Sequence, residues 1–236
     1  MTVIVYGSAE LLAAATAARL VTALSDAQAA RGRASVVLTG GRTGTAVLSS
    51  VRTAPARDSV DWSQVDFYWG DERFLPAGDQ ERNDTQARAA LLDQLPATRV
   101  HAMAPSDGEF GDDPDAAAAA YAALLPATFD VCLLGVGEEG HTASIFPDSP
   151  AVHEATRTVV AVRDCPKPPP TRVSLTLPTI RRSTAVWLMT TGESKADAVA
   201  SALNGASEVA IPAAGAQGRD ETLWLLDTTA AAKHAR

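Results

Sequence analysis

Short apolar runs alternate along this 236-residue chain with longer segments of helical periodicity. The apolar runs predict strands at Val3–Tyr6, Ser35–Thr39, Val65–Trp69, Phe129–Gly135, Arg157–Val162, Val173–Leu175, Ala185–Thr190 and Thr222–Leu226. The segments between them predict helices at Leu11–Leu24, Thr45–Arg52, Thr85–Leu95, Pro114–Leu125, Ser194–Leu203 and Thr228–Ala235. This alternation predicts a single α/β domain, residues 1–236, with a mostly parallel, twisted sheet and helices on both faces.

Two of these helices carry capping signals at their expected starts. Asp113 precedes Pro114, and an acidic N-cap followed by proline is typical of a first helical turn. Asn83 or Asp84 is available as the N-cap of the helix expected from Thr85.

Charge and composition narrow the class of ligand. The net charge of −8 excludes the general basic field of a nucleic-acid-binding protein, although a few local cations can still bind a phosphorylated metabolite. The two cysteines match no zinc-binding spacing, so we expect no metal site. The longest apolar runs are too short to span a bilayer and no signal-peptide pattern begins the chain, so we expect no membrane association and a cytoplasmic location.

Four motif-like stretches begin where predicted strands end: Thr39–Gly44, Gly70–Arg73, Gly135–His141 and Thr191–Lys195. Ligands of open α/β sheets bind at the carboxyl ends of the strands. We therefore expect these four stretches to meet at one site.

The glycine stretch Gly40-Gly41-Arg42-Thr43-Gly44 precedes a predicted helix. Glycines let the backbone approach a ligand, and free N–H groups at a helix start favour an anion. Lys195 can add an ammonium group to the same phosphate. Alone, the glycine stretch is equally consistent with a plain tight turn, and Lys195 with a solvated surface lysine.

Asp71, Glu72 and Arg73 follow another strand. They are consistent with a surface ion-pair cluster, which contributes little. The functional interpretation is an arginine held by acids so that it faces an anionic substrate or a developing oxyanion.

His141 differs from the other three histidines because it follows a strand and a glycine-rich turn. Glu138 and Glu139 lie close to it in sequence, and a carboxylate can orient an imidazole and raise its basicity. Histidine titrates near neutrality and is suited to deprotonating water. His141 is therefore the candidate general base.

Together these stretches resemble the 6-phosphogluconolactonase family, within the glucosamine-6-phosphate isomerase/6-phosphogluconolactonase superfamily. The matching blocks occur in family order at Leu38–Gly41, Trp69–Pro76, Leu134–Pro147, Pro166–Pro178 and Thr191–Ala196. The resemblance implies a Rossmann-like fold of the sugar-phosphate isomerase type.

The resemblance also implies hydrolysis of 6-phospho-D-glucono-1,5-lactone without metal or organic cofactor, by a carboxylic ester hydrolase acting in the pentose phosphate pathway. His141 would activate water, Glu139 would orient it, and Arg73, beside Asp71, would hold substrate or stabilise charge. The residues that map onto phosphate or substrate contacts are Gly40, Gly41, Arg42, Thr43, Arg172 and Lys195.

The chain departs from the family pattern at two positions. Arg42-Thr43-Gly44 replaces the usual Ser-Thr-Pro, so Arg42 either adds a cation to the phosphate or points to solvent. Glu139 replaces the usual aspartate, which leaves open whether Glu139 or Glu138 orients His141.

Three other functions compete with this interpretation. A glucosamine-6-phosphate deaminase/isomerase would carry a glutamate where this chain has Phe146. An acyl-enzyme through Ser194, in a motif one glycine short of a nucleophile elbow, would require a histidine near the C-terminus. A non-catalytic sugar-phosphate sensor would bind without turnover. We expect a small-molecule partner only, and a monomer or small homo-oligomer.

Overall fold

The main sheet contains seven strands that all run parallel, in the order β1-β10-β9-β6-β2-β3-β5. The computed structural model describes residues 1–96 and 99–234. In sheet order the strands are β1 (Thr2–Tyr6), β10 (Glu221–Asp227), β9 (Ala185–Thr190), β6 (Val131–Gly135), β2 (Ala34–Leu38), β3 (Val65–Trp69) and β5 (Arg99–Val100). The prediction of a mostly parallel sheet is confirmed.

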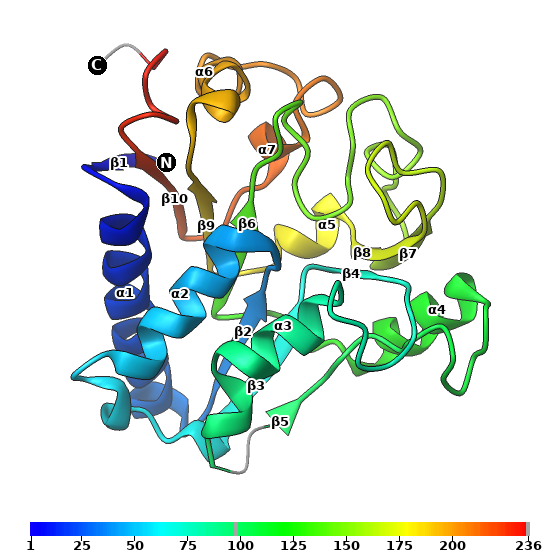
Figure 1. Cartoon of the computed structure of the whole chain (residues 1–236), viewed down its shortest axis with the longest axis horizontal. Coiled ribbons are helices and arrows are strands. Elements are labelled where there is room, and N and C mark those ends of the chain that lie inside the picture. Colours follow the sequence, from blue (N-terminus) through cyan, green and yellow to red (C-terminus); the bar gives the residue numbers. More distant parts are fainter. Residues whose placement is uncertain (97–98, 235–236) are drawn as a thin grey trace.

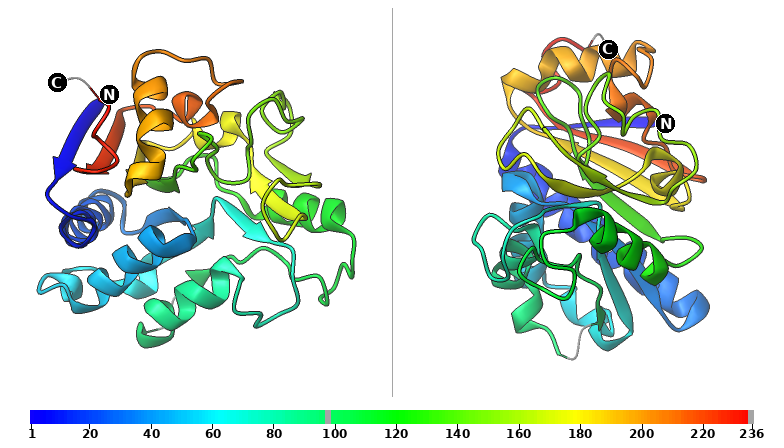
Figure 2. Two further views of the ribbon diagram at one scale, coloured as in Figure 1. Left: turned by 45° about the horizontal axis from the view of Figure 1, so that its top comes forward. Right: turned by 90° about the vertical axis from the view of Figure 1, so that its right-hand side faces the viewer.

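Helices cover both faces of this sheet (Figures 1 and 2). Helices α1 and α2 pack together on one side, and α6 and α7 lie on the other (Figure 2). The helices are α1 (Ala9–Arg31), α2 (Gly41–Thr53), α3 (Asn83–Ala90), α4 (Pro114–Leu124), α5 (Leu177–Ile180), α6 (Ala196–Leu203) and α7 (Pro212–Gly215). Because both faces are covered, the central strand β9 is buried at all six residues and is almost wholly apolar.

A second, antiparallel sheet of three strands lies beside the first, in the order β4-β8-β7. It comprises β4 (Asp71–Arg73), β8 (Arg172–Leu175) and β7 (Val159–Val162). No strand was predicted at Asp71–Arg73, which follows the end of β3. It forms a strand because Arg172–Ser174 supply the hydrogen-bonding partners, which the local sequence does not reveal.

Helix starts follow the capping signals in part. Asp113 caps α4 as predicted, with its carboxylate accepting hydrogen bonds from the N–H groups of Asp115 and Ala116. Helix α2 begins at Gly41, four residues before the predicted Thr45, because the glycine stretch itself forms the first helical turn.

Helix α3 begins at Asn83, so neither Asn83 nor Asp84 is its N-cap. It ends at Ala90, and a 3₁₀ turn at Leu92–Gln94 replaces the rest of the expected helix. The helix expected near Thr228–Ala235 is also absent, since residues 228–233 form turns; Ala235 lies outside the described residues. Within the described residues, no helix is both long and apolar enough to cross a membrane.

Candidate functional site

The four predicted stretches converge on a cleft of about 290 Å³ at the carboxyl ends of β2, β3, β6 and β9. The predicted residues that line it are Gly40, Gly41, Arg42, Thr43, Asp71, Arg73, His141, Arg172 and Lys195. Glu139 lies just behind His141, which it contacts. The convergence expected from the strand ends is thus observed.

The N-terminus of α2 forms one wall of the cleft. Gly40 occupies the N-cap position without a side-chain cap, so the first backbone N–H groups of α2 remain available to an anion. A Cβ atom at Gly40 would lie 1.8 Å from Oδ1 of Asn83, so only glycine fits against that amide. Thr43 and Thr191 join this wall to the end of β9 through a hydroxyl contact of 3.1 Å.

His141 lies in the turn that follows β6, with its ring packed against Phe146 at a centroid distance of 4.5 Å. Gly137 leaves room for the ring, because a Cβ atom there would lie 1.9 Å from Nδ1 of His141. Burial lowers the pKa of His141 below its ordinary value, although the Glu139 carboxylate acts in the opposite direction. The imidazole is therefore neutral at neutral pH, as a general base requires.

Glu139, not Glu138, reaches the histidine. Its Oε1 lies 3.0 Å from Nδ1 of His141, although the ring N–H is not aligned with that oxygen for a full hydrogen bond. Oε2 of Glu139 accepts a hydrogen bond of 2.9 Å from Lys167. Glu138 instead accepts a hydrogen bond of 2.8 Å from Lys195. Each of the two glutamates therefore holds one lysine of the cleft.

Asp71 faces the cleft from β4 and is nearly buried. Its Oδ2 accepts a hydrogen bond of 2.6 Å from Ser144, and its main-chain carbonyl accepts one of 2.8 Å from Asn83. Nη1 of Arg172 lies 3.9 Å from the same carboxylate oxygen. Asp71 thus joins β4 to the His141 turn, to α3 and to β8.

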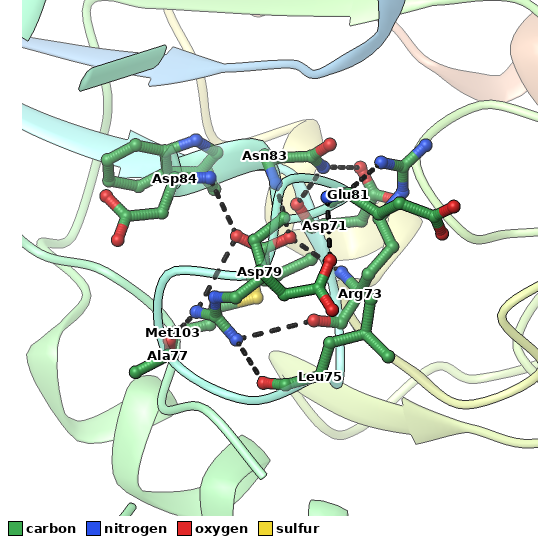
Figure 3. A network of polar contacts seen from close by, with 12 residues as sticks. Asp71, Arg73, Leu75, Ala77, Asp79, Glu81, Asn83, Asp84 and Met103 are labelled. Atoms are coloured by element: carbon green, nitrogen blue, oxygen red, sulfur yellow. Dashed lines mark hydrogen bonds and ion pairs between the residues drawn. The ribbon is translucent and has the colours of Figure 1, made fainter. Parts of the chain in front are cut away.

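Glu72, between Asp71 and Arg73, is buried and does not line the cleft. A network of polar contacts around Asp71, Arg73, Asn83 and Asp84 is drawn in Figure 3. The Glu72 carboxylate accepts hydrogen bonds from the backbone N–H groups of Arg73, Asn83 and Asp84 at 2.7, 2.7 and 2.8 Å. Nη2 of Arg82 lies 3.7 Å from it. Glu72 therefore caps α3 from a different element, which is why the expected caps within the helix are not used.

The two predicted arginines differ in how their guanidinium groups are held. Arg73 donates to the main-chain carbonyl of Glu81 and lines the cleft. Arg172 donates to three carbonyls of the proline-rich loop, those of Lys167, Pro168 and Pro169. Arg172 therefore fixes this loop as well as facing the cleft.

Sequence reasoning missed Asn83, Lys167 and Ser144 as site residues. Lys167 lies within a matched block but carried no individual signal, and Asn83 was assessed only as a helix cap. Asn83 and Lys167 line the cleft, and Ser144 lies behind it and donates a hydrogen bond to Asp71. Among the described residues, no three His, Cys, Asp or Glu side chains cluster so as to hold a metal ion.

The fold and the site define an α/β protein with a cation-lined cleft and a partly buried histidine at the carboxyl edge of its sheet. A family model described as glucosamine-6-phosphate isomerases/6-phosphogluconolactonase matches residues 7–224. The chain belongs to this family, and the resemblance found in its motifs is confirmed.

Within the family, the relatives point to one activity. Proteins named 6-phosphogluconolactonase from Streptomyces coelicolor and Mycobacterium tuberculosis are 57% and 54% identical to this chain. These matches cover 99% and 97% of this chain and 94% and 96% of the relatives.

Solved structures agree with this fold. The 6-phosphogluconolactonase from Trypanosoma brucei superposes with a TM-score of 0.86 at 28% identity, over 99% of this chain and 98% of that one. A monomeric glucosamine-6-phosphate deaminase, at 20% identity and a TM-score of 0.83, shares the fold over 99% of this chain and all of its own.

Proposed function

We propose that this chain is a 6-phosphogluconolactonase that hydrolyses 6-phospho-D-glucono-1,5-lactone to 6-phospho-D-gluconate. The observation that carries the proposal is the partly buried His141, next to Glu139, in a cleft that also holds the open N-terminus of α2. High identity over nearly the whole length of relatives with this name supports the same activity.

Substrate binding begins with the phosphate group. The free N–H groups of Gly41 and its neighbours bind it together with Lys195, and Arg42 and Arg172 add positive charge. Lys195 exchanges its partner Glu138 for the phosphate. This anchoring holds the lactone carbonyl next to His141.

His141 then acts as the general base. Its Nδ1 is turned toward Glu139, so Nε2 is the nitrogen that accepts a proton from the attacking water. The water oxygen bonds to the carbonyl carbon, and Arg73 stabilises the resulting oxyanion, with Asp71 holding the surrounding arginines in place. When the bond from the carbonyl carbon to the ring oxygen breaks, the imidazolium returns the proton to that oxygen, which becomes a hydroxyl group.

The environment of His141 favours lactonase over deaminase chemistry. Phe146, in the position where the deaminase carries a glutamate, is buried and packs against the His141 ring. An apolar ring there cannot shuttle a proton during ring opening. The proposal extends to a single catalytic domain over residues 1–236 in the cytoplasm, acting as a monomer or small homo-oligomer.

The test is a lactonase assay with freshly generated substrate, corrected for spontaneous hydrolysis. A positioned general base contributes about 10²- to 10⁴-fold, so His141→Ala should lose kcat on that order. His153→Ala, which changes an exposed histidine in a turn, is the matched control and should keep wild-type activity.

Four outcomes would contradict the proposal. Wild-type activity in His141→Ala would remove His141 from the mechanism. Loss of turnover in Ser194→Ala would indicate an acyl-enzyme. Release of ammonia from glucosamine 6-phosphate, or binding of the lactone without turnover, would indicate the deaminase or the sensor.

A further inference from the structure

A continuous chain of charged side chains links the proline-rich loop to His141. Nζ of Lys167 donates a hydrogen bond of 2.9 Å to Oε2 of Glu139, and Oε1 of the same carboxylate lies 3.0 Å from Nδ1 of His141. The two oxygens of Glu139 therefore have separate partners, one on the loop and one on the histidine.

Lys167 is anchored more firmly than an ordinary surface lysine. Nη2 of Arg172 donates to the carbonyls of Lys167 and Pro168 at 3.2 and 3.1 Å, and Nε donates to that of Pro169 at 2.9 Å. Arg172 is itself nearly buried in β8. The backbone that carries Lys167 is thus fixed relative to the second sheet.

The length of the Glu139 side chain makes this bridge possible. Removing one methylene, as in aspartate, would shorten the side chain by about 1.5 Å. The carboxylate would then lose at least one of its two contacts, because both are already at hydrogen-bonding distance. The glutamate in this chain therefore contacts Lys167 and His141 at the same time, which an aspartate at the same backbone position does not.

We propose that Lys167 is a positioning residue of the lactonase reaction, which orients Glu139 so that its free oxygen faces His141. The proposal rests on the function assigned above. In it, Lys167 acts through Glu139 rather than by binding the substrate phosphate, the role given to Lys195.

The electrostatic setting of His141 gives this role a distinct signature. The charged groups that face the imidazole are Glu139 from its own turn, Lys167 from the proline-rich loop and Asp71 from β4. Lys167 acts to lower the pKa of His141, whereas Glu139 and Asp71 act to raise it. Removing the Lys167 charge therefore raises the pKa of His141.

The test compares Lys167→Met with wild type in kcat, KM and the pH profile of kcat/KM. The base acts in its neutral form, and removing the lysine raises the pKa of His141. The acid limb of the kcat/KM profile should therefore move to higher pH in Lys167→Met. Misplacement of Glu139 should lower kcat by about 10- to 100-fold, with little change in KM. Lys233→Met, which removes an exposed lysine paired with Asp197, is the matched control and should change neither quantity.

Inorganic phosphate, used as a competitive inhibitor, separates positioning from direct phosphate binding. Its inhibition constant should rise in Lys195→Met and stay near the wild-type value in Lys167→Met. The proposal would be overturned if the inhibition constant rose as much in Lys167→Met as in Lys195→Met while the acid limb of the pH profile of kcat/KM stayed at its wild-type position.

A double-mutant comparison tests the route through Glu139. In a Glu139→Asp background, Lys167→Met should lower kcat by a smaller factor than in wild type, because the bridge is already broken. An equal factor in both backgrounds would refute the coupling.

Titration of His141 followed by NMR tests the same arrangement without turnover, with circular dichroism as the check on folding. An unchanged His141 titration in folded Lys167→Met would contradict the inference. If the wild-type protein does not hydrolyse the lactone, the proposed function is wrong. If the wild-type protein is active but Lys167→Met behaves like wild type, only this inference is wrong.

Discussion

Gly40 and Gly137 are two glycines of the cleft at which an added side chain would clash with a neighbouring side chain. Gly40 faces the amide of Asn83 and Gly137 faces the ring of His141, and a Cβ atom at these two positions would lie 1.8 and 1.9 Å from its neighbour. These distances are far below van der Waals contact, so each glycine permits a close approach between two elements of the site.

Gly40→Ala should therefore disturb the phosphate-binding wall. The added methyl group must displace either Asn83, which hydrogen-bonds to Asp71, or the first turn of α2. Overpacking of this kind costs about 1–3 kcal/mol of stability, and we expect KM for the lactone to rise. Steady-state kinetics and urea unfolding measure the two effects.

Gly7→Ala is the control for this substitution, because its Cβ atom would meet only Leu11 at an ordinary 3.6 Å. It should leave KM unchanged. Wild-type KM and stability in Gly40→Ala would show that the contact with Asn83 yields easily.

At the residue scale, sequence reasoning identified those residues whose chemistry follows from a local pattern. His141 and Lys195 each follow a strand end, and the cleft contains both. Lys167 and Asn83 could not be identified in this way, because their partners Glu139 and Asp71 lie in distant parts of the sequence. Only the folded chain brings them together.

At the scale of elements, strand β4 organises one side of the cleft. Its alternation turns Asp71 and Arg73 toward the cleft and Glu72 toward the interior. Glu72 then fixes the start of α3, and with it Asn83. One buried carboxylate thus fixes the position of α3 relative to β4.

Glu72→Ala should destabilise the protein strongly. The change leaves the buried Arg82 without its carboxylate and removes the acceptor of three backbone N–H groups. Breaking a buried pair by removing one partner costs about 3–5 kcal/mol. The free energy of unfolding measured with urea checks this value.

Glu81→Ala is the neighbouring control, since the Glu81 side chain is exposed. Its free energy of unfolding should stay within about 0.5 kcal/mol of wild type. Equal stabilities of the two variants would refute the capping role of Glu72.

The element predictions succeeded fully where a short apolar run is buried, as in β9, which spans the predicted Ala185–Thr190. The helix predicted at Leu11–Leu24 is present but longer, since α1 spans Ala9–Arg31. The predictions failed where a partner distant in sequence decides the structure. The strand β4 depends on β8, and the start of α3 depends on Glu72. For 228–233, no such contact explains why turns replace the expected helix.

At the scale of the whole molecule, positive charge is concentrated in the cleft although the chain carries a net charge of −8. The cations that line the cleft are Arg42, Arg73, Lys167, Arg172 and Lys195. An acidic protein can bind a phosphorylated metabolite only where a few cations lie close together, and these five side chains form such a cluster.

The reaction product 6-phosphogluconate should therefore raise the melting temperature. A ligand present at about 100 times its Kd stabilises the native state by about 2.7 kcal/mol. Thermal unfolding with and without the ligand measures this effect, which should weaken as sodium chloride screens the cleft. Gluconate, which lacks the phosphate, is the control and should produce a much smaller shift.

The sheet order also has a consequence for how the chain is assembled. β1, the first strand in the sequence, forms one edge of the main sheet and pairs there with β10, the last strand, with Thr2 opposite Leu223 (Figure 1). During synthesis on a ribosome, β1 must remain without its neighbour until nearly the whole chain has been made. The half of the sheet that contains β2 and β3 can form early, whereas closure at β1 is a late, non-local step.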